Sequence, residues 1–287
     1  MVHRADPTLD QLRLPVGDLT FDAVAAGPPE GRPILLLHGF PQTSWSWRLV
    51  LPRLAAAGRR AIAVNQRGYS PDASPDPVGA YTGEELVGDV LGVLDALGCD
   101  TVDLVGHDWG AAVAWQLAGL HPERLTTLTA LSVPHPGAFL QALADDADQR
   151  TRSAYLRDFP RPRVEHELLA DDAAPLRAML GAHPGVDVAH MLERVGTPSR
   201  LRRALNWYAA QSRQRSASIP AVRVPTLHLW SDGDPFLGEA ATLATAAFVT
   251  GPYRLHVLEG VGHWIPEEAP ETVAELLLSH LARFPRE

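Results

Sequence analysis

The sequence contains no lysine, so all 25 of its basic residues are arginine. This absence excludes a Schiff-base lysine, the phosphate-binding lysine of a P-loop and the lysine of kinase-type ATP sites. Against 34 acidic residues the formal net charge is −9. An acidic chain without basic runs is not expected to bind nucleic acid or an anionic membrane. We attribute the missing lysine to the codon bias of a GC-rich genome rather than to the chemistry of the protein.

Cysteine and long apolar runs are also scarce. The single cysteine, Cys99, can form neither an intramolecular disulfide nor a cysteine metal site. Residues 1–15 carry charges throughout and lack the apolar stretch of a secretion signal. The longest apolar runs are about half as long as a membrane span needs. These features predict a cytoplasmic protein, and we expect no metal and no cofactor.

Short apolar runs alternate with helix-like segments along most of the chain. Six runs read as buried strands: 34–37, 61–64, 102–105, 125–131, 226–230 and 255–258. Five segments have helical spacing or composition: 45–57, 84–97, 110–120, 240–248 and 271–284. Thr82, with Glu85 three residues later, predicts a capping box at the second of these helices. The alternation predicts an α/β fold with a mostly parallel sheet covered on both faces.

The alternation breaks between residues 134 and 222, where no clear strand run occurs. Four short helical pieces are found there instead: 150–156, 165–170, 176–180 and 199–213. A structureless loop of this length is not expected inside a compact domain. We therefore predict a core formed by residues 1–133 and 223–287, with a helical cap at 134–222. The predicted cap has a net charge of +2, whereas the rest of the chain is strongly acidic.

The most informative segment is 102–112, in which a strand run meets Gly-His-Asp-Trp-Gly and a helix follows. The two glycines permit a sharp strand-to-helix turn that exposes the central residue, Asp108, at the top of the sheet. Such a turn usually carries serine, and the chain contains no Gly-x-Ser-x-Gly. We interpret Asp108 as a nucleophile; the alternative is an aspartate that only caps the helix.

A catalytic acid and a general base are expected after later strands. The turn Ser-Asp-Gly-Asp-Pro follows the fifth predicted strand and offers Asp232 and Asp234, either of which could be a plain turn residue. His263 lies in a glycine-rich loop after the last predicted strand, where a base would sit. Two other histidines, His38 and His107, adjoin the site and are expected to hold hydrogen bonds that shape it.

The sequence His-Gly-Phe-Pro, residues 38–41, ends the first predicted strand and supplies a candidate oxyanion hole. The backbone N–H of Phe40 is expected at the top of that strand, together with the N–H of Trp109 directly after Asp108. Two such donors can stabilise a developing oxyanion. Alone the segment could be an ordinary turn. Its interpretation as an oxyanion hole depends on the candidate nucleophile and on the candidate acid and base described above.

With these residues the chain resembles the α/β-hydrolase superfamily over essentially its whole length. Its aspartate elbow resembles the branch of epoxide hydrolases and of haloalkane or haloacid dehalogenases. The resemblance implies an eight-stranded, mostly parallel sheet with a helical cap, and a triad of Asp108, Asp234 and His263. Asp234 is preferred to Asp232 for its family-like context, Gly-Asp-Pro-Phe-Leu.

The two reactions of this branch differ in the leaving group. A halide leaves as a stable anion, whereas an epoxide oxygen needs a proton donor. The predicted cap contains two candidate donors, Tyr155 and Tyr208. The segment Leu-Asn-Trp-Tyr, which ends at Tyr208, closely resembles a segment that carries one cap tyrosine of epoxide hydrolases. The surroundings of Tyr155 resemble the segment that carries the other cap tyrosine less tightly. Either tyrosine could instead be an amphipathic helix residue with a wet hydroxyl.

Other functions fit the residues less well. Haloalkane dehalogenases typically have a halide-binding Asn or Trp where this chain has Phe40, and fluoroacetate dehalogenases have arginines where residues 111–113 are Ala-Ala-Val. A non-catalytic ligand-binding protein of this fold has no need of a complete triad. We therefore predict an epoxide hydrolase acting on a small apolar epoxide and water, with His38, Trp47 and Phe139 binding substrate. The sequence leaves open whether the chain forms a homo-oligomer.

Overall fold

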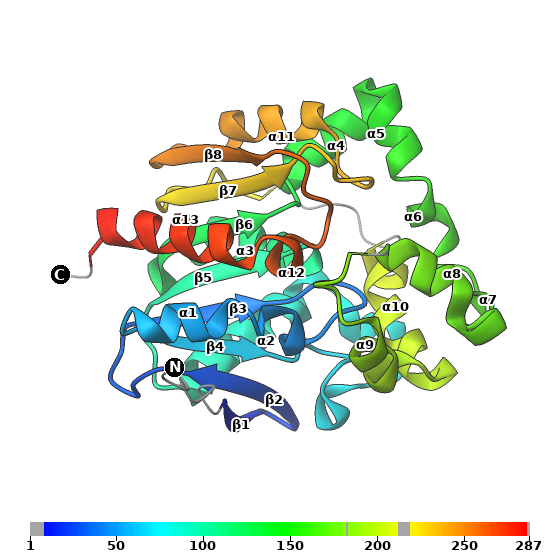
Figure 1. The fold of residues 1–287 in the computed structure, drawn as a ribbon, viewed down its shortest axis with the longest axis horizontal. Helices are drawn as coiled ribbons and strands as arrows, with labels where there is room; N and C mark the ends of the chain where they lie inside the picture. Colours follow the sequence, from blue (N-terminus) through cyan, green and yellow to red (C-terminus); the bar gives the residue numbers. More distant parts are fainter. Residues whose placement is uncertain (1–8, 182, 212–218, 286–287) are drawn as a thin grey trace, which may run out of the picture.

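The computed structural model describes residues 9–181, 183–211 and 219–285, and it centres on one eight-stranded sheet (Figure 1). The strand order is β1-β2-β4-β3-β5-β6-β7-β8. β1 (Asp10–Val16) is antiparallel to β2 (Leu19–Ala26), which is antiparallel to β4 (Arg60–Val64); the later neighbours are parallel. This arrangement confirms the predicted fold. Residues 1–8, which belong to the N-terminal segment predicted to lack a secretion signal, lie outside the described residues.

The six predicted strands are all present, at or slightly beyond their predicted bounds. They are β3 (Pro33–Leu37), β4, β5 (Val102–His107), β6 (Leu125–Leu131), β7 (Thr226–Ser231) and β8 (Tyr253–Leu258). Only β1 and β2 were not predicted individually. They form an antiparallel hairpin at the edge of the sheet, where one face of a strand can stay wet and a continuous apolar run is not needed.

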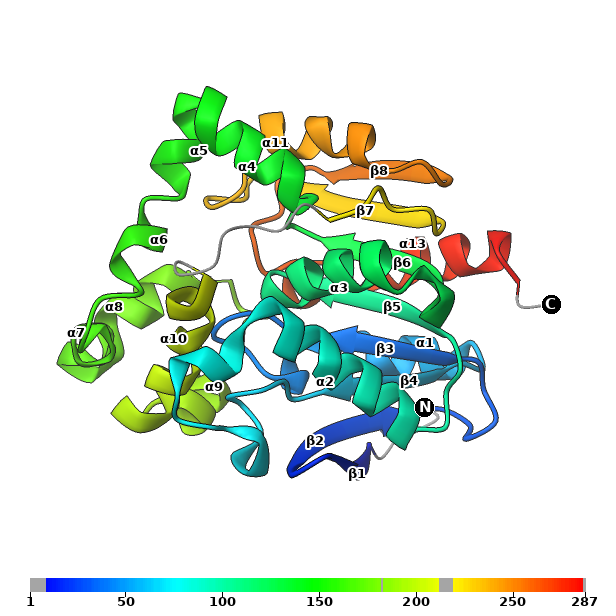
Figure 2. The ribbon, with the colours of Figure 1, turned by 180° about the vertical axis from the view of Figure 1, so that it is seen from behind.

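Helices cover both faces of the sheet. One face carries α1 (Leu51–Ala56) and α13 (Pro270–Arg283), which lie in front in Figure 1, and the other carries α2 (Gly83–Ala96) and α3 (Trp109–Leu120), in front in Figure 2. Alternate strand residues serve the two layers: Leu35 and Leu104 pack in the cluster with α2 and α3, and Leu36 and Val105 in the cluster with α1 and α13. This period of two explains why buried parallel strands are apolar throughout.

Helix ends follow local chemistry. Thr82 Oγ1 accepts the Glu85 backbone N–H at 3.4 Å, which confirms Thr82 as the N-cap of α2. The single helix predicted at 45–57 is wrong: the chain forms the 3₁₀ turn η1 (Ser44–Trp47) before α1, because proline in the first turn of α1 favours a new helix start. The predicted helix 240–248 likewise divides into α11 (Glu239–Ala244) and η5 (Thr245–Phe248).

Between β6 and β7 the regular elements of the described residues are helices, grouped at one end of the sheet (Figures 1 and 2). They are α4 (Pro136–Asp145), α5 (Ala147–Arg152), α6 (Tyr155–Asp158), α7 (Val164–Leu168), α8 (Ala170–Leu180), α9 (Val188–Val195) and α10 (Pro198–Gln211). The piece predicted at 150–156 spans α5 and α6, while the last residues of the piece predicted at 199–213 lie outside the described residues. The boundaries 134 and 222 stay a prediction. No helix among the described residues has the length and apolar character to cross a membrane.

Three fully buried histidines make the stability of the fold dependent on pH. Burial lowers the pKa of His38, His107 and His228 to about 4, so these side chains stay neutral in the fold. In the unfolded chain a histidine takes up its proton near pH 6.5. The unfolded state therefore binds more protons between pH 6.5 and 4, and we expect the free energy of unfolding to fall as the pH is lowered through this window.

Denaturant titrations at several pH values would measure this slope, to which each such histidine contributes about 1.4 kcal/mol per pH unit. His228→Gln offers a test away from the turn that carries Asp108, and it should reduce the slope by the contribution of one proton. An unchanged slope in that variant would contradict the assignment.

Candidate active site

Asp108 lies alone in a tight turn between β5 and α3. Its backbone has φ 52° and ψ −122°, a conformation that is strained for a residue with a side chain. The turn needs glycine on both sides: a Cβ on Gly106 would lie 2.3 Å from the Gly110 carbonyl oxygen, and a Cβ on Gly110 would lie 2.3 Å from that of Leu37. The sequence Gly-x-Asp-x-Gly is therefore what places Asp108 at the end of the sheet.

The carboxylate of Asp108 does not cap α3. Its Oδ1 accepts a hydrogen bond from the Phe40 N–H at 2.8 Å, and its Oδ2 lies 3.6 Å from His263 Nε2. Phe40 follows β3 and joins Pro41 through a cis peptide bond. Asp108 thus faces the predicted oxyanion donor and the predicted base, which favours the nucleophile interpretation over the capping one.

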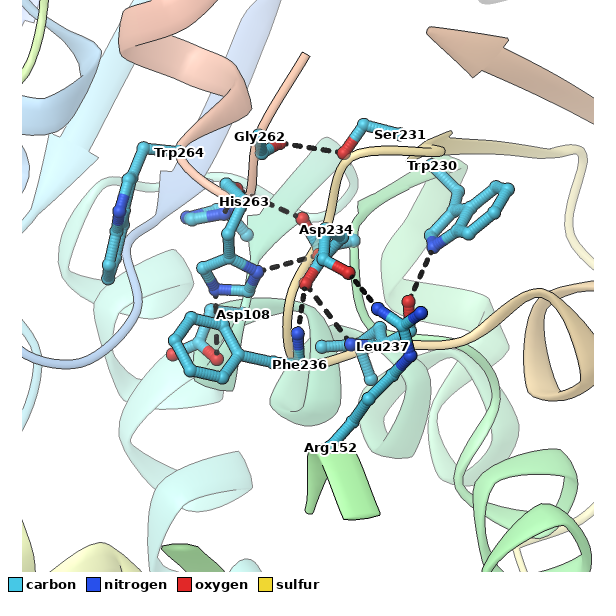
Figure 3. Close-up of polar contacts among 12 residues, drawn as sticks. Asp108, Arg152, Trp230, Ser231, Asp234, Phe236, Leu237, Gly262, His263 and Trp264 are labelled. Atoms are coloured by element: carbon cyan, nitrogen blue, oxygen red, sulfur yellow. Dashed lines mark hydrogen bonds and ion pairs between the residues drawn. The ribbon is translucent and has the colours of Figure 1, made fainter. Parts of the chain in front are cut away.

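The geometry selects Asp234 over Asp232 as the partner of His263. Asp234 is fully buried, and its Oδ2 lies 2.7 Å from His263 Nδ1 (Figure 3). Its Oδ1 accepts the backbone N–H groups of Phe236 at 2.8 Å and Leu237 at 3.1 Å. Asp232 is exposed and accepts only the N–H of Gly260. The carboxylate of Asp234 is thus fixed on one side by its own loop and directed at the imidazole on the other.

The three side chains are electrostatically coupled. Burial would lower the pKa of His263, but the carboxylates of Asp234 and Asp108 outweigh it and raise that pKa to about 10. Burial would likewise raise the pKa of Asp108, but the hydrogen bond and charge of His263 hold it below its usual value. At neutral pH the free site therefore holds an imidazolium between two carboxylates.

His38 and His107 brace the backbone around this group. His38 Nε2 accepts the Gln66 N–H at 3.1 Å, which leaves Nδ1 as a donor to the Gly39 carbonyl at 3.0 Å. His107 Nε2 lies 2.8 Å from the carbonyl oxygen of His263. Both rings are completely buried. This arrangement agrees with the expectation that they hold hydrogen bonds at the site.

A cavity of about 300 Å³ opens beside Asp108. Asp108, Trp109, Tyr155 and Tyr208 are among the residues that line it. Most of the remaining lining is apolar: Ala112, Val133, Pro136, Phe139, Leu140, Leu143, Leu156 and Leu237. A space of this size and character suits a small apolar molecule.

The two cap tyrosines meet over the cavity. Tyr155 begins α6 and Tyr208 lies within α10, and their ring centroids are 6.1 Å apart. Burial raises the pKa of both phenols, and the charge of Asp108 adds to the shift. Both tyrosines therefore keep their protons at neutral pH and can act as hydrogen-bond donors.

The Leu-Asn-Trp-Tyr segment places Tyr208 by anchoring α10 to the core. Asn206 Nδ2 donates to the Asp76 carbonyl at 3.1 Å, and Trp207 Nε1 donates to the Arg67 carbonyl at 2.9 Å. The ring of Tyr208 then packs edge-on against Trp109, with centroids 5.0 Å apart. These anchors explain why the tyrosine occurs in this sequence context.

Two predicted substrate-binding residues are corrected. Trp47 is fully buried with Leu36 and Leu54 in the cluster beneath α1 and α13, because η1 turns its ring toward the core. His38 lies behind the oxyanion turn, with its ring nitrogens engaged by backbone groups. Neither residue lines the cavity as the described residues form it, whereas Phe139, on α4, does.

Two polar lining residues, Gln116 and Gln211, were missed. Helical spacing offered a signal, since Gln116 lies two turns beyond Asp108 on α3 and Gln211 lies three residues after Tyr208 on α10. The spacing shows a shared face of each helix, but it does not tell which face borders a cavity.

Comparisons with known proteins show which family the chain belongs to. A family model described as alpha/beta hydrolase fold matches residues 32–270. Epoxide hydrolase A of Mycobacterium tuberculosis is 32% identical, with 90% of this chain and 92% of the relative covered. Human epoxide hydrolase 4 is 30% identical, with 96% and 80% covered.

The solved structure of epoxide hydrolase A from Mycobacterium thermoresistibile is also similar. It superposes with a TM-score of 0.83 at 26% identity, covering 98% of this chain and 100% of that one. The family match and the relatives at 30% identity or more span most of the chain. The chain therefore belongs to the α/β-hydrolase fold family and, within it, groups with the epoxide hydrolases.

Proposed function

We propose that this protein is an epoxide hydrolase that opens a small apolar epoxide to a vicinal diol through an ester of Asp108. The observation that carries the proposal is a single apolar cavity in which Asp108, backed by His263, faces Tyr155 and Tyr208. Relatives named epoxide hydrolases at 30–32% identity over most of the chain support it. The reaction requires water and the substrate alone.

In the first step a carboxylate oxygen of Asp108 attacks an epoxide carbon. The bond between that carbon and the ring oxygen breaks, and the electron pair goes to the oxygen. Tyr155 and Tyr208 hydrogen-bond this oxygen, and one of them gives it a proton. The resulting tyrosinate recovers a proton from water. Oδ1 of Asp108 accepts the Phe40 N–H, whereas Oδ2 lies 3.6 Å from His263 Nε2, so we assign the attack to Oδ2.

The second step hydrolyses the ester. Esterification removes the charge of Asp108, one of the two charges that raise the pKa of His263. The imidazolium then gives its Nε2 proton to the hydroxide left when the tyrosinate took a proton from water, and the neutral imidazole can act as a base. His263 Nε2 then takes a proton from water, whose oxygen attacks the carboxyl carbon. The backbone N–H groups of Phe40 and Trp109 stabilise the oxyanion. Its collapse releases the diol and restores the carboxylate.

A dehalogenase is the alternative with the same nucleophile. A halide needs N–H donors and no proton, so two protonated phenols over the cavity would have no role in its departure. The position of Phe40 beside Asp108 offers a backbone N–H but no side-chain donor for a halide. The site therefore supports epoxide opening more strongly.

Heavy-oxygen water tests the ester route. In a single turnover with excess enzyme, the hydrolysing water should leave its oxygen in Asp108, while the diol keeps oxygens from the epoxide and from unlabelled Asp108. Mass spectrometry of the peptide that contains Asp108 would detect the label. Label only in the diol would contradict the route, and halide release from haloalkanes in a parallel assay would favour the alternative.

We also propose the cytoplasm as the location. The single cysteine, Cys99, suits a reducing compartment.

A further inference from the structure

The first helix that follows α4 in the cap is tied to the loop that carries Asp234. We name residues 234–238, which follow β7, the acid loop. On the core side Trp230 Nε1 donates to the Leu237 carbonyl at 3.1 Å (Figure 3). On the cap side the partners of the loop are two residues of α5, Gln149 and Arg152.

Gln149 uses both ends of its side-chain amide on this contact. Its Nε2 donates to the Phe236 carbonyl at 2.9 Å and to Ser153 Oγ at 2.8 Å, while its Oε1 accepts the Gly238 N–H at 2.8 Å. The side chain is fully buried. A buried amide with both donors and its acceptor engaged admits one orientation, so it fixes the relative position of helix and loop.

Arg152 adds a contact one turn further along α5. Its Nη1 donates to the Asp234 carbonyl at 2.5 Å (Figure 3). Its Nε donates to Asp148 Oδ2 at 2.6 Å. Because Gln149 and Arg152 are three residues apart, they lie on one face of α5. That face contacts the acid loop at both of its ends.

The acid loop contacts both the candidate base, His263, and a candidate proton donor, Tyr155. The ring of Phe236 packs edge-on against the imidazole of His263, with centroids 4.9 Å apart, and edge-on against Tyr155, at 5.4 Å. Tyr155 follows Arg152 by three residues at the start of α6. A displacement of α5 from the acid loop would therefore disturb the proton donor and the Asp234–His263 pair together.

We propose that Gln149 is a positioning residue that holds the acid loop, and through it Asp234 and His263, in line with Tyr155. The inference rests on the proposed function for its kinetic consequence, but the hydrogen bonds themselves do not depend on a substrate. It assigns the cap a task beyond covering the cavity, because the cap then orients the general base as well as supplying the tyrosines.

Gln149→Met tests the proposal, since methionine has a similar length and makes none of the three hydrogen bonds. We expect kcat to fall roughly ten- to hundredfold, because small displacements of catalytic groups have effects of this size. Hydrolysis of the ester should be slowed more than its formation, so rapid-quench mass spectrometry should detect more alkylated Asp108 than in the unaltered protein. Gln141→Met, the same change at an exposed position on α4, is the matched control and should behave like the unaltered protein.

A second measurement needs no substrate. The proton on His263 Nδ1, held by Asp234, should give a low-field NMR resonance, and Gln149→Met should shift or broaden it. A folded Gln149→Met with the resonance and the kcat unaltered would overturn the proposal, as would a lower kcat with an unaltered resonance. If Gln149→Met does not fold, Arg152→Met gives the same tests at a partly exposed side chain. A protein that hydrolyses no epoxide would refute the proposed function, while the resonance would still decide the role of Gln149.

Discussion

His263→Gln is expected to accumulate the alkyl-enzyme ester while steady-state turnover falls by about 10²–10⁴-fold, the usual contribution of a general base. Ring opening uses the carboxylate of Asp108 and the cap phenols, which this change leaves in place. Ester hydrolysis uses the base, and glutamine cannot take a proton from water. The first half-reaction should therefore continue until Asp108 is fully esterified.

Intact-protein mass spectrometry after rapid mixing would measure this trapped state as an increase equal to the mass of the epoxide. Asp108→Asn in the same background should remove the increase, because the amide is a poor nucleophile. His121→Gln, at a partly exposed position after α3, provides a control for loss of a histidine. Undiminished turnover by His263→Gln would remove His263 from the mechanism.

Replacing both cap tyrosines by phenylalanine should nearly abolish ring opening, whereas Tyr208→Phe alone should only slow it. The ring oxygen would otherwise leave as a strongly basic alkoxide, and one phenol can still hydrogen-bond and protonate it when the other is absent. The positioned proton donor is worth about 10²–10⁴-fold, which sets the expected loss in the double variant. The burst rate of ester formation is the relevant measurement, because it isolates this step.

The double variant keeps the aromatic packing, because phenylalanine retains the rings that contact each other over the cavity. Tyr253→Phe, on β8 outside the cavity lining, is the control for loss of a partly buried phenol. A double variant that forms the ester at an undiminished rate would exclude both phenols as proton donors, and the dehalogenase alternative would then regain weight.

Much of this site could be predicted because each component is encoded locally. Asp108 is the centre of a five-residue motif whose two glycines are needed where the backbone approaches closely. His263 and the oxyanion residue Phe40 each lie in the loop that follows a strand, and parallel strands bring such loops to one edge of the sheet. The choice between Asp232 and Asp234 depended on resemblance, because both occur in the same turn and only the fold shows which carboxylate meets the imidazole.

What could not be predicted depends on packing between distant segments. Tryptophan is a residue type expected in an apolar pocket, but the direction of the 3₁₀ turn η1 places Trp47 in the core instead. Gln149 lies in a polar stretch, Asp-Ala-Asp-Gln-Arg, that reads as exposed helix. Its partners in the acid loop are more than eighty residues away in the chain, so no local pattern indicates that its amide is buried.

The contact between α5 and the acid loop has a consequence for protein engineering. Caps are attractive units to exchange between related hydrolases when a different substrate range is wanted. Here the segment to be exchanged is discontinuous in the sequence, because α5, which precedes Tyr155, forms hydrogen bonds to residues 234–238 of the core. A chimaera should therefore transfer the donor's version of that loop along with its cap. Otherwise the chimaera would keep the pocket of the foreign cap, but His263 would be displaced from its catalytic position.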